Sequence, residues 1–306
     1  MNLGWVAGRW LLVLPLLIAG GCSGLGARPG SAGEPEVTAR AARVKALSER
    51  AQAALDRGDL EAARVDLVEL TNLPPTSAEA LYRLGTVLKL EGRWAEAEAS
   101  FRGALKRDPD YPLAMVGLGE VEAHRGDSPS ALKHFETAIE IDPFQPSAHF
   151  AMGRLLERMN RPNSALTAYF RALEYDPNNP DVSLRIAMIQ LARDEPDQAL
   201  SRLDRVVEQA PENALARDVR GLANLRLGLA ARAVADFQAF LVRYPDLPKG
   251  LYHLAVALER DGQPAEARRV AARGLRLAPT DPGLRGLAER LALAPPPVNP
   301  QPAPPR

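Results

Sequence analysis

The 306-residue sequence contains a single cysteine, Cys22, and few aromatic residues. One cysteine excludes an intramolecular disulfide, a CxxC pair and a thiolate metal site. Aromatic residues make up 5% of the chain, whereas Ala, Leu, Arg and Glu are abundant. Those four are helix formers with little β-branching, so the composition predicts a helical protein.

The sequence also lacks net charge, with 38 basic and 38 acidic side chains. Nucleic-acid binding needs a basic excess, so no nucleic-acid partner is expected. The two signs are unevenly spread, with 22 basic and 30 acidic residues in 34–213 but 13 and 8 in 214–294. The simpler interpretation is that the uneven charge reflects chance variation along solvated helix faces. The alternative is a rod whose two ends differ in charge and prefer different partners.

No apolar run is long enough to span a bilayer comfortably. Residues 1–22 read MNLGWVAGRWLLVLPLLIAGGC, with Arg9 before a short apolar core and small residues before Cys22. This pattern is typical of a signal peptide. Its end resembles the lipobox of bacterial lipoprotein precursors, in which a small residue precedes the cysteine that becomes lipidated. Gly21 fits that pattern, whereas Ala19 stands where Leu is usual.

The lipobox resemblance implies lipidation at Cys22, with cleavage elsewhere or an uncleaved anchor as alternatives. Ser23 in place of Asp implies the outer membrane of a two-membrane bacterium. We therefore expect an exported chain, anchored by lipid to the periplasmic face of that membrane. Residues 23–43 begin with Gly, Ala, Ser and Pro and are expected to form a flexible tether.

Prolines recur at intervals of 34 residues, which predicts a repeat of that length. Three further sets of residues recur at the same interval, and we call each set of equivalent positions a column. The prolines are Pro75, Pro109, Pro143, Pro177, Pro211, Pro245 and Pro279. An invariant alanine column is Ala63, Ala97, Ala131, Ala165, Ala199, Ala233 and Ala267. A small column is Ala51, Gly85, Gly119, Gly153, Ala187, Gly221 and Ala255, and a mostly large one is Leu67, Phe101, Phe135, Tyr169, Leu203, Phe237 and Ala271. Small residues inside helices predict close helix–helix approach, with the large column filling the space between.

A turn position lies between the two helices of each unit. It holds Gly58, Gly92, Gly126, Asn160, Asp194, Gly228 and Gly262. Gly, Asn and Asp tolerate the left-handed backbone at a helix C-terminus. Each unit is therefore predicted to be helix, tight turn, helix.

The spacing resembles the tetratricopeptide repeat (TPR) family, whose signature is W-x2-L-G-x2-Y, then A-x3-F, then P. The second unit reads LYRLGTVL, AEASF and P at these places. The resemblance implies an all-α, right-handed superhelical solenoid of seven helix-turn-helix units, each of 34 residues. The units are 44–77, 78–111, 112–145, 146–179, 180–213, 214–247 and 248–281.

Two segments follow the repeats. Residues 282–294 are expected to form a capping helix over the last apolar face. Residues 295–306 are Pro-rich and expected to be disordered, with a ligand for a polyproline-binding module as the less favoured alternative. The sixth unit has Arg217, Arg220 and Asn224 where apolar residues are expected, so its first helix is expected to pack less well.

These segments occupy the whole chain and leave no stretch for a catalytic domain. The sequence has no HExxH, P-loop, GxSxG or strand-associated GxGxxG motif. Glu120 and His124 are four residues apart, which favours an exposed helical pair over a metal site. We expect no enzyme, metal, cofactor or small-molecule substrate.

The resemblance implies that the first helix of each unit lines a concave groove that binds a protein or peptide segment. The matching positions are Tyr82, Thr86, Lys89, Val116, Glu120, Phe150, Arg154, Leu184, Met188, Leu222, Leu225, Tyr252 and Val256. Tyr, Phe, Met and Arg are enriched at interfaces, although some of these residues could instead complete the core. The sequence thus predicts a membrane-anchored scaffold for an envelope complex such as a pilus or secretion channel. The alternative is an adaptor for peptidoglycan or polysaccharide enzymes.

Overall fold

The computed structural model describes residues 34–293. The predicted signal peptide, Cys22, the first part of the predicted tether and the Pro-rich tail lie outside these residues. The chain separates into two compact units, residues 1–46 and 47–306. The described part of the first unit is the N-terminal portion of helix α1, and the second unit holds the repeats.

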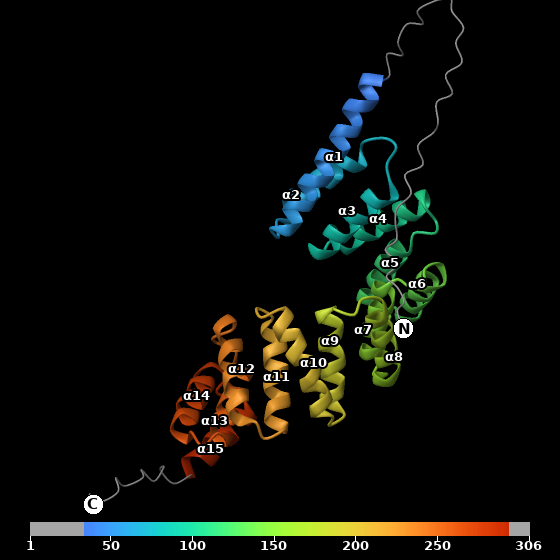
Figure 1. Ribbon diagram of the computed structural model, residues 1–306. Helices are drawn as coiled ribbons and strands as arrows, with labels where there is room; N and C mark the ends of the chain where they lie inside the picture. The colour runs from blue at the N-terminus through green and yellow to red at the C-terminus, as the bar shows by residue number, and fades with distance from the viewer. Residues whose placement is uncertain (1–33, 294–306) are drawn as a thin grey trace, which may run out of the picture. The chain divides into compact units, whose positions relative to one another are not determined.

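Residues 34–293 form fifteen α-helices joined by short turns (Figure 1). The helices are α1 (Glu34–Asp56), α2 (Leu60–Thr71), α3 (Ala78–Leu90), α4 (Trp94–Arg107), α5 (Pro112–Arg125), α6 (Ser128–Ile141), α7 (Pro146–Arg158), α8 (Pro162–Tyr175), α9 (Pro180–Ala192), α10 (Pro196–Gln209), α11 (Ala214–Arg226), α12 (Ala230–Arg243), α13 (Pro248–Arg260), α14 (Pro264–Leu277) and α15 (Pro282–Leu293). From α3 to α14 the odd-numbered helix is the first of a unit and packs against the even-numbered one that follows.

Helix α1 begins earlier than the sequence analysis expects. The predicted tether extends to residue 43, whereas α1 is helical from Glu34. Residues 37–54 are rich in Ala and Arg, which have high helix propensity and extend the helix beyond the repeat frame. The helical part of the chain therefore includes residues 34–43.

All seven turn positions have left-handed backbone. Their φ values run from +57° at Asn160 to +89° at Gly126. Proline then occupies the first helical turn of α8, α10 and α14, where its missing N–H is not needed. This chemistry reverses the chain within each unit and explains the spacing of the turn residues.

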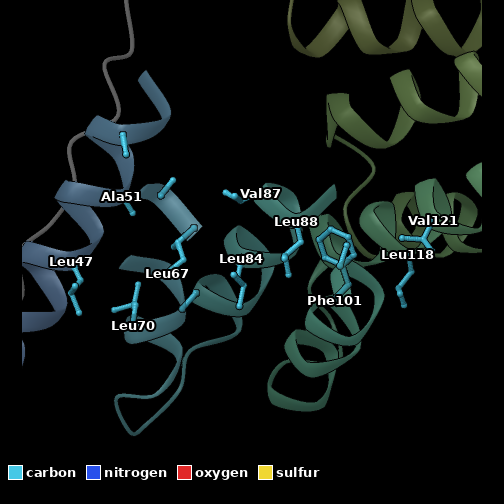
Figure 2. Packing of buried hydrophobic residues seen from close by; sticks show 14 residues of the cluster. Leu47, Ala51, Leu67, Leu70, Leu84, Val87, Leu88, Phe101, Leu118 and Val121 are labelled. Atoms are coloured by element: carbon cyan, nitrogen blue, oxygen red, sulfur yellow. The ribbon is translucent and has the colours of Figure 1, made fainter. Parts of the chain in front are cut away.

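The buried apolar residues within 34–293 form five clusters, and each cluster includes residues of more than one unit. One cluster extends from Leu47 on α1 through Leu67 and Phe101 to Leu118 and Val121 on α5 (Figure 2). Each helix alone buries too little apolar surface to be stable in water, so neighbouring units stabilise one another. Helix α15 closes the series, with Leu284, Leu287 and Leu291 fully buried against the last repeat.

The first helix of the sixth unit, α11, does not pack poorly as expected. Its polar residues have partners, because Arg220 and Asn224 both donate to Asp236 on α12. Asn224 and Asp236 are each 2% exposed. The pairing partner lies twelve or sixteen residues away on the next helix, so the repeat frame alone did not reveal it.

Within residues 34–293, no helix combines the length and apolar character that crossing a bilayer requires.

Candidate protein-binding groove

The predicted groove residues all lie on the first helices of the units. They are Tyr82, Thr86 and Lys89 on α3, Val116 and Glu120 on α5, Phe150 and Arg154 on α7, Leu184 and Met188 on α9, Leu222 and Leu225 on α11, and Tyr252 and Val256 on α13. First helices contact one another directly between α3 and α5, α5 and α7, α9 and α11, and α11 and α13. Residues at the same position of neighbouring units are therefore brought near each other.

A hollow of about 480 Å³ opens along α3, α5 and α7. We call it the α3–α7 hollow. Three of the predicted residues line it, namely Lys89, Glu120 and Arg154. The remaining lining residues are Leu90, Trp94, Ala123, His124, Phe135, Ala151, Leu155 and Arg158.

An ionic ladder connects the three units along this hollow. The Glu120 carboxylate accepts a hydrogen bond from Lys89 Nζ of the preceding unit. Its other oxygen lies 3.6 Å from Nη1 of Arg154 in the following unit. The Arg154 guanidinium in turn lies 5.8 Å from the ring centroid of Phe150, within range of a cation–π interaction. Four predicted groove residues therefore form one connected group.

The hollow carries excess positive charge. Lys89, Arg154 and Arg158 contribute three cationic groups, and Glu120 is the one carboxylate among the lining residues. The apolar lining comprises Leu90, which is 59% exposed, and the core residues Leu155 and Phe135, which are 2% and 1% exposed. Cations beside apolar surface suit a protein segment that carries both acidic and apolar side chains.

Two aromatic rings at the rim were missed by the sequence analysis. The Trp94 indole, on the first residue of α4, stacks on the His124 imidazole, with centroids 3.8 Å apart and planes 11° apart. Neither residue falls in a first-helix groove column, which is why the repeat frame did not select them. Within residues 34–293, no group of three or more His, Cys, Asp and Glu side chains is placed so that it could hold a metal ion.

Models of the tetratricopeptide repeat match residues 48–146, 156–223 and 248–293. The chain belongs to the tetratricopeptide repeat family. This confirms the resemblance, and the family is in general a non-enzymatic protein-interaction fold. No curated protein matches the sequence of this TPR chain.

Solved TPR structures share the fold. The APC/C hetero-tetramer Cut9–Hcn1 is similar with a TM-score of 0.63 and 14% identity, over 76% of this chain and 48% of that one. This chain thus spans about half the length of the chain that it matches there. PilW, a type IV pilus biogenesis factor, has a TM-score of 0.59 and 20% identity over 69% of this chain and 97% of its own. Pseudomonas aeruginosa PilF has a TM-score of 0.53 and 18% identity, over 82% of this chain and 99% of its own.

Three of the predicted groove residues belong to the TPR core instead. Val116, Leu184 and Leu225 are 6%, 5% and 7% exposed and lie in buried apolar clusters. The burial arises because these side chains point between units rather than out of the first helix. They are therefore unavailable to a partner.

The remaining groove positions change character along the TPR units. The ninth residue of each unit is Thr86, Glu120 and Arg154 in the second to fourth units, then Met188, Leu222 and Val256 in the fifth to seventh. The last three are partly buried and pack against the core clusters of their units. The ninth position is thus polar or charged in the second to fourth units and apolar in the fifth to seventh.

Arginines also tie successive first helices together. Arg158 Nη2 donates to the Ala123 carbonyl at 2.7 Å, and Arg260 Nη1 to the Leu225 carbonyl at 3.1 Å. Arg226 donates likewise to the Leu191 carbonyl. Each arginine is the thirteenth residue of its unit, and each adds a second donor to a helix C-terminal carbonyl that already accepts a backbone N–H from the following turn. The recurrence of arginine at the thirteenth position is visible in the sequence, but this position is not among the predicted groove positions.

Proposed function

We propose that this TPR protein is a non-enzymatic scaffold that holds a segment of a partner protein in the α3–α7 hollow. The observation that carries the proposal is the ladder of Lys89, Glu120 and Arg154 beside the partly exposed Trp94 and the exposed Leu90. Its net positive charge favours a partner segment with acidic and apolar residues. The hollow is built by three units, so it offers a binding length that no single repeat has.

We further propose that the scaffold works from a bacterial envelope membrane and assists assembly of a complex such as a pilus or secretion channel. Support for the membrane is the signal-like N-terminus that ends in Gly21-Cys22. Support for the pathway is the shared fold with PilW and PilF, which is a likeness of architecture only.

The test of the scaffold is crosslinking of the full chain in its native membranes, followed by identification of the captured protein. Arg154→Glu reverses a charge of the hollow next to Glu120, and Phe150→Ala, outside the lining itself, removes the ring that lies beside the Arg154 guanidinium. Each is expected to lower capture about five- to thirtyfold, the range of an interface residue worth 1–2 kcal/mol. Helicity and thermal unfolding, measured in parallel, report whether the variants remain folded.

Arg171→Glu is the matched control, because Arg171 is exposed on α8 and does not line the hollow. Normal capture by both Phe150→Ala and Arg154→Glu would overturn the groove assignment. The identity of the captured protein tests the pathway separately. Capture of pilus or secretion subunits would support the proposed pathway. Capture of peptidoglycan enzymes would agree with the scaffold proposal but contradict the pathway.

A further inference from the structure

A second hollow, of about 270 Å³, lies mostly in the fifth unit and shares no residue with the α3–α7 hollow. The loop before α9, the first turns of α9 and one face of α10 form it. The lining residues are Pro177, Asn178, Ser183, Gln198, Ser201, Arg202, Arg205, Val206 and Gln209. None of them is acidic, and seven of the nine carry a hydrogen-bond donor on the side chain. We call this the α9–α10 hollow.

Arg202 lies at this hollow without an ionic partner. Its Nε is buried and has no hydrogen-bond acceptor within the described residues. Its guanidinium lies 5.6 Å from the ring centroid of Phe170, which covers one face. Burial, together with the positive charge of Arg205, lowers the pKa of Arg202. Arg202 is only partly buried, but its buried Nε is a donor that carries a free-energy cost until an acceptor, such as an anion, binds to it.

Arg205 differs from the arginines at the same place in other units. Six residues before the repeat proline, the fourth unit has Arg171 and the seventh has Arg273. Arg171 pairs with Glu174 at 2.7 Å, and Arg273 with Asp246 at 2.9 Å. Within residues 34–293 the structure pairs Arg205 with no carboxylate. The fifth unit therefore directs two unpaired guanidinium groups to one hollow.

We propose that the α9–α10 hollow binds a tetrahedral oxyanion of the phosphate monoester class. Two guanidiniums, the hydroxyls of Ser183 and Ser201, and nearby amides offer more donors than the two oxygens of a carboxylate can accept. A phosphate has three or four acceptor oxygens and up to two negative charges, so it satisfies both arginines. The donors come from α9, α10 and the loop before α9, so the site is built within one short stretch of the chain. This inference goes beyond the proposed scaffold and does not depend on partner capture.

The direct test is calorimetric titration of the full chain with inorganic phosphate in a chloride buffer free of phosphate and sulfate. We expect one saturable site per chain. Arg205→Gln and Arg202→Gln should each weaken binding at least about tenfold, because each removes a charge-assisted pair of hydrogen bonds. Arg205 is exposed, so Arg205→Gln keeps the test valid even if Arg202→Gln unfolds.

The matched control is Arg171→Gln, which removes an arginine at the same repeat position and should bind phosphate like the unaltered chain. Absence of saturable binding would overturn the proposal, as would an equal loss in Arg171→Gln. Acetate, titrated in place of phosphate, should bind at least about tenfold more weakly. Equal binding of acetate would overturn the assignment to a tetrahedral oxyanion.

Flotation with vesicles distinguishes the source of the phosphate. Vesicles of phosphatidylcholine with phosphatidic acid are compared with vesicles of phosphatidylcholine alone, for the full chain and Arg205→Gln. If Arg205→Gln floats less than the unaltered chain with the vesicles that contain phosphatidic acid, but equally with those of phosphatidylcholine alone, the ligand is a lipid headgroup. Phosphate binding without such a drop supports a soluble phosphate ester. Both results agree with the proposed chemistry.

Discussion

At the residue scale, the small-column residue and the large-column residue of each unit pack against each other and fill one space between the two helices. Where the small residue is glycine, it faces an aromatic ring: a Cβ at Gly85 would lie 2.6 Å from Phe101, and one at Gly221 would lie 2.6 Å from Phe237. Where it is alanine, the facing residue is smaller. The three such pairs are Ala51 with Leu67, Ala187 with Leu203 and Ala255 with Ala271. The two columns therefore compensate for each other within a unit.

This compensation predicts that Gly221→Ala destabilises the sixth unit. Overpacking against Phe237 costs about 1–3 kcal/mol, partly offset by the higher helix propensity of Ala, about 0.5–1 kcal/mol. Adding Phe237→Leu, which recreates the pairing of the fifth unit, should recover part of the loss. Urea unfolding followed by circular dichroism measures both. The control is Gly286→Ala on α15, where an added Cβ meets nothing within 4 Å and should not destabilise.

A second prediction concerns the turn glycines. At Gly126, φ is +89° and an added Cβ meets nothing within 4 Å, so only backbone strain opposes a side chain. Gly126→Ala should lower the free energy of unfolding by about 1–2 kcal/mol. Gly126→Asn should cost less, since Asn160 occupies the equivalent turn with φ +57°. Thermal unfolding of the two variants checks this, and equal losses would refute the role of left-handed backbone.

At the scale of the element, buried polar groups join helices α10, α11 and α12. Arg220 contacts Asp236 on α12, with Nη2 2.5 Å from Oδ1, and Asp204 on α10, with Nη1 3.1 Å from Oδ1. Asn224 adds a hydrogen bond of 3.0 Å to the same Asp236 carboxylate. The hydrogen bonds with Asp236 raise the pKa of Arg220. One carboxylate therefore accepts hydrogen bonds from two polar side chains at positions where the repeat pattern predicts apolar residues, while the buried Oδ1 of Asn224 has no partner within the described residues.

Asp236→Ala is expected to destabilise the chain by about 3–5 kcal/mol, because it leaves Arg220 partly buried without a carboxylate on α12. Asp204→Ala removes the exposed partner of the same arginine and should cost less than about 1 kcal/mol. Chemical denaturation of both variants provides the comparison. A small loss in Asp236→Ala would show that the network contributes little to the packing of α11.

At the scale of the whole molecule, the proposed anchor leads to a prediction about fractionation. If Cys22 is lipidated, Cys22→Ser should move the chain from the membrane fraction to the soluble fraction. Incorporation of labelled palmitate should be lost at the same time. Ser23→Ala, next to the cysteine, is the control and should keep the label. A Cys22→Ser chain that stays in the membrane would instead support the uncleaved anchor.

The repeat array could be predicted because each of its determinants is local and recurs. Glycine, asparagine or aspartate at every 34th position set the left-handed turns, and proline marked the helix starts and unit ends. The family matches then confirmed the resemblance to tetratricopeptide repeats. The start of α1 was misplaced, because residues 34–43 are helical by propensity and lie outside the repeat.

The sequence by itself determined the fold class, the turns and the positions of each helix that face a neighbouring helix. These features follow from the regular repeat period and from the backbone preferences of individual residues. Only the tertiary structure decided which side chains meet across units. It assigned Val116, Leu184 and Leu225 to the core, stacked Trp94 on His124, paired Arg220 with Asp236 and left Arg205 without a carboxylate. Such contacts depend on the relative rotation of neighbouring helices, and a rotation of a few tens of degrees changes a partner without changing the repeat.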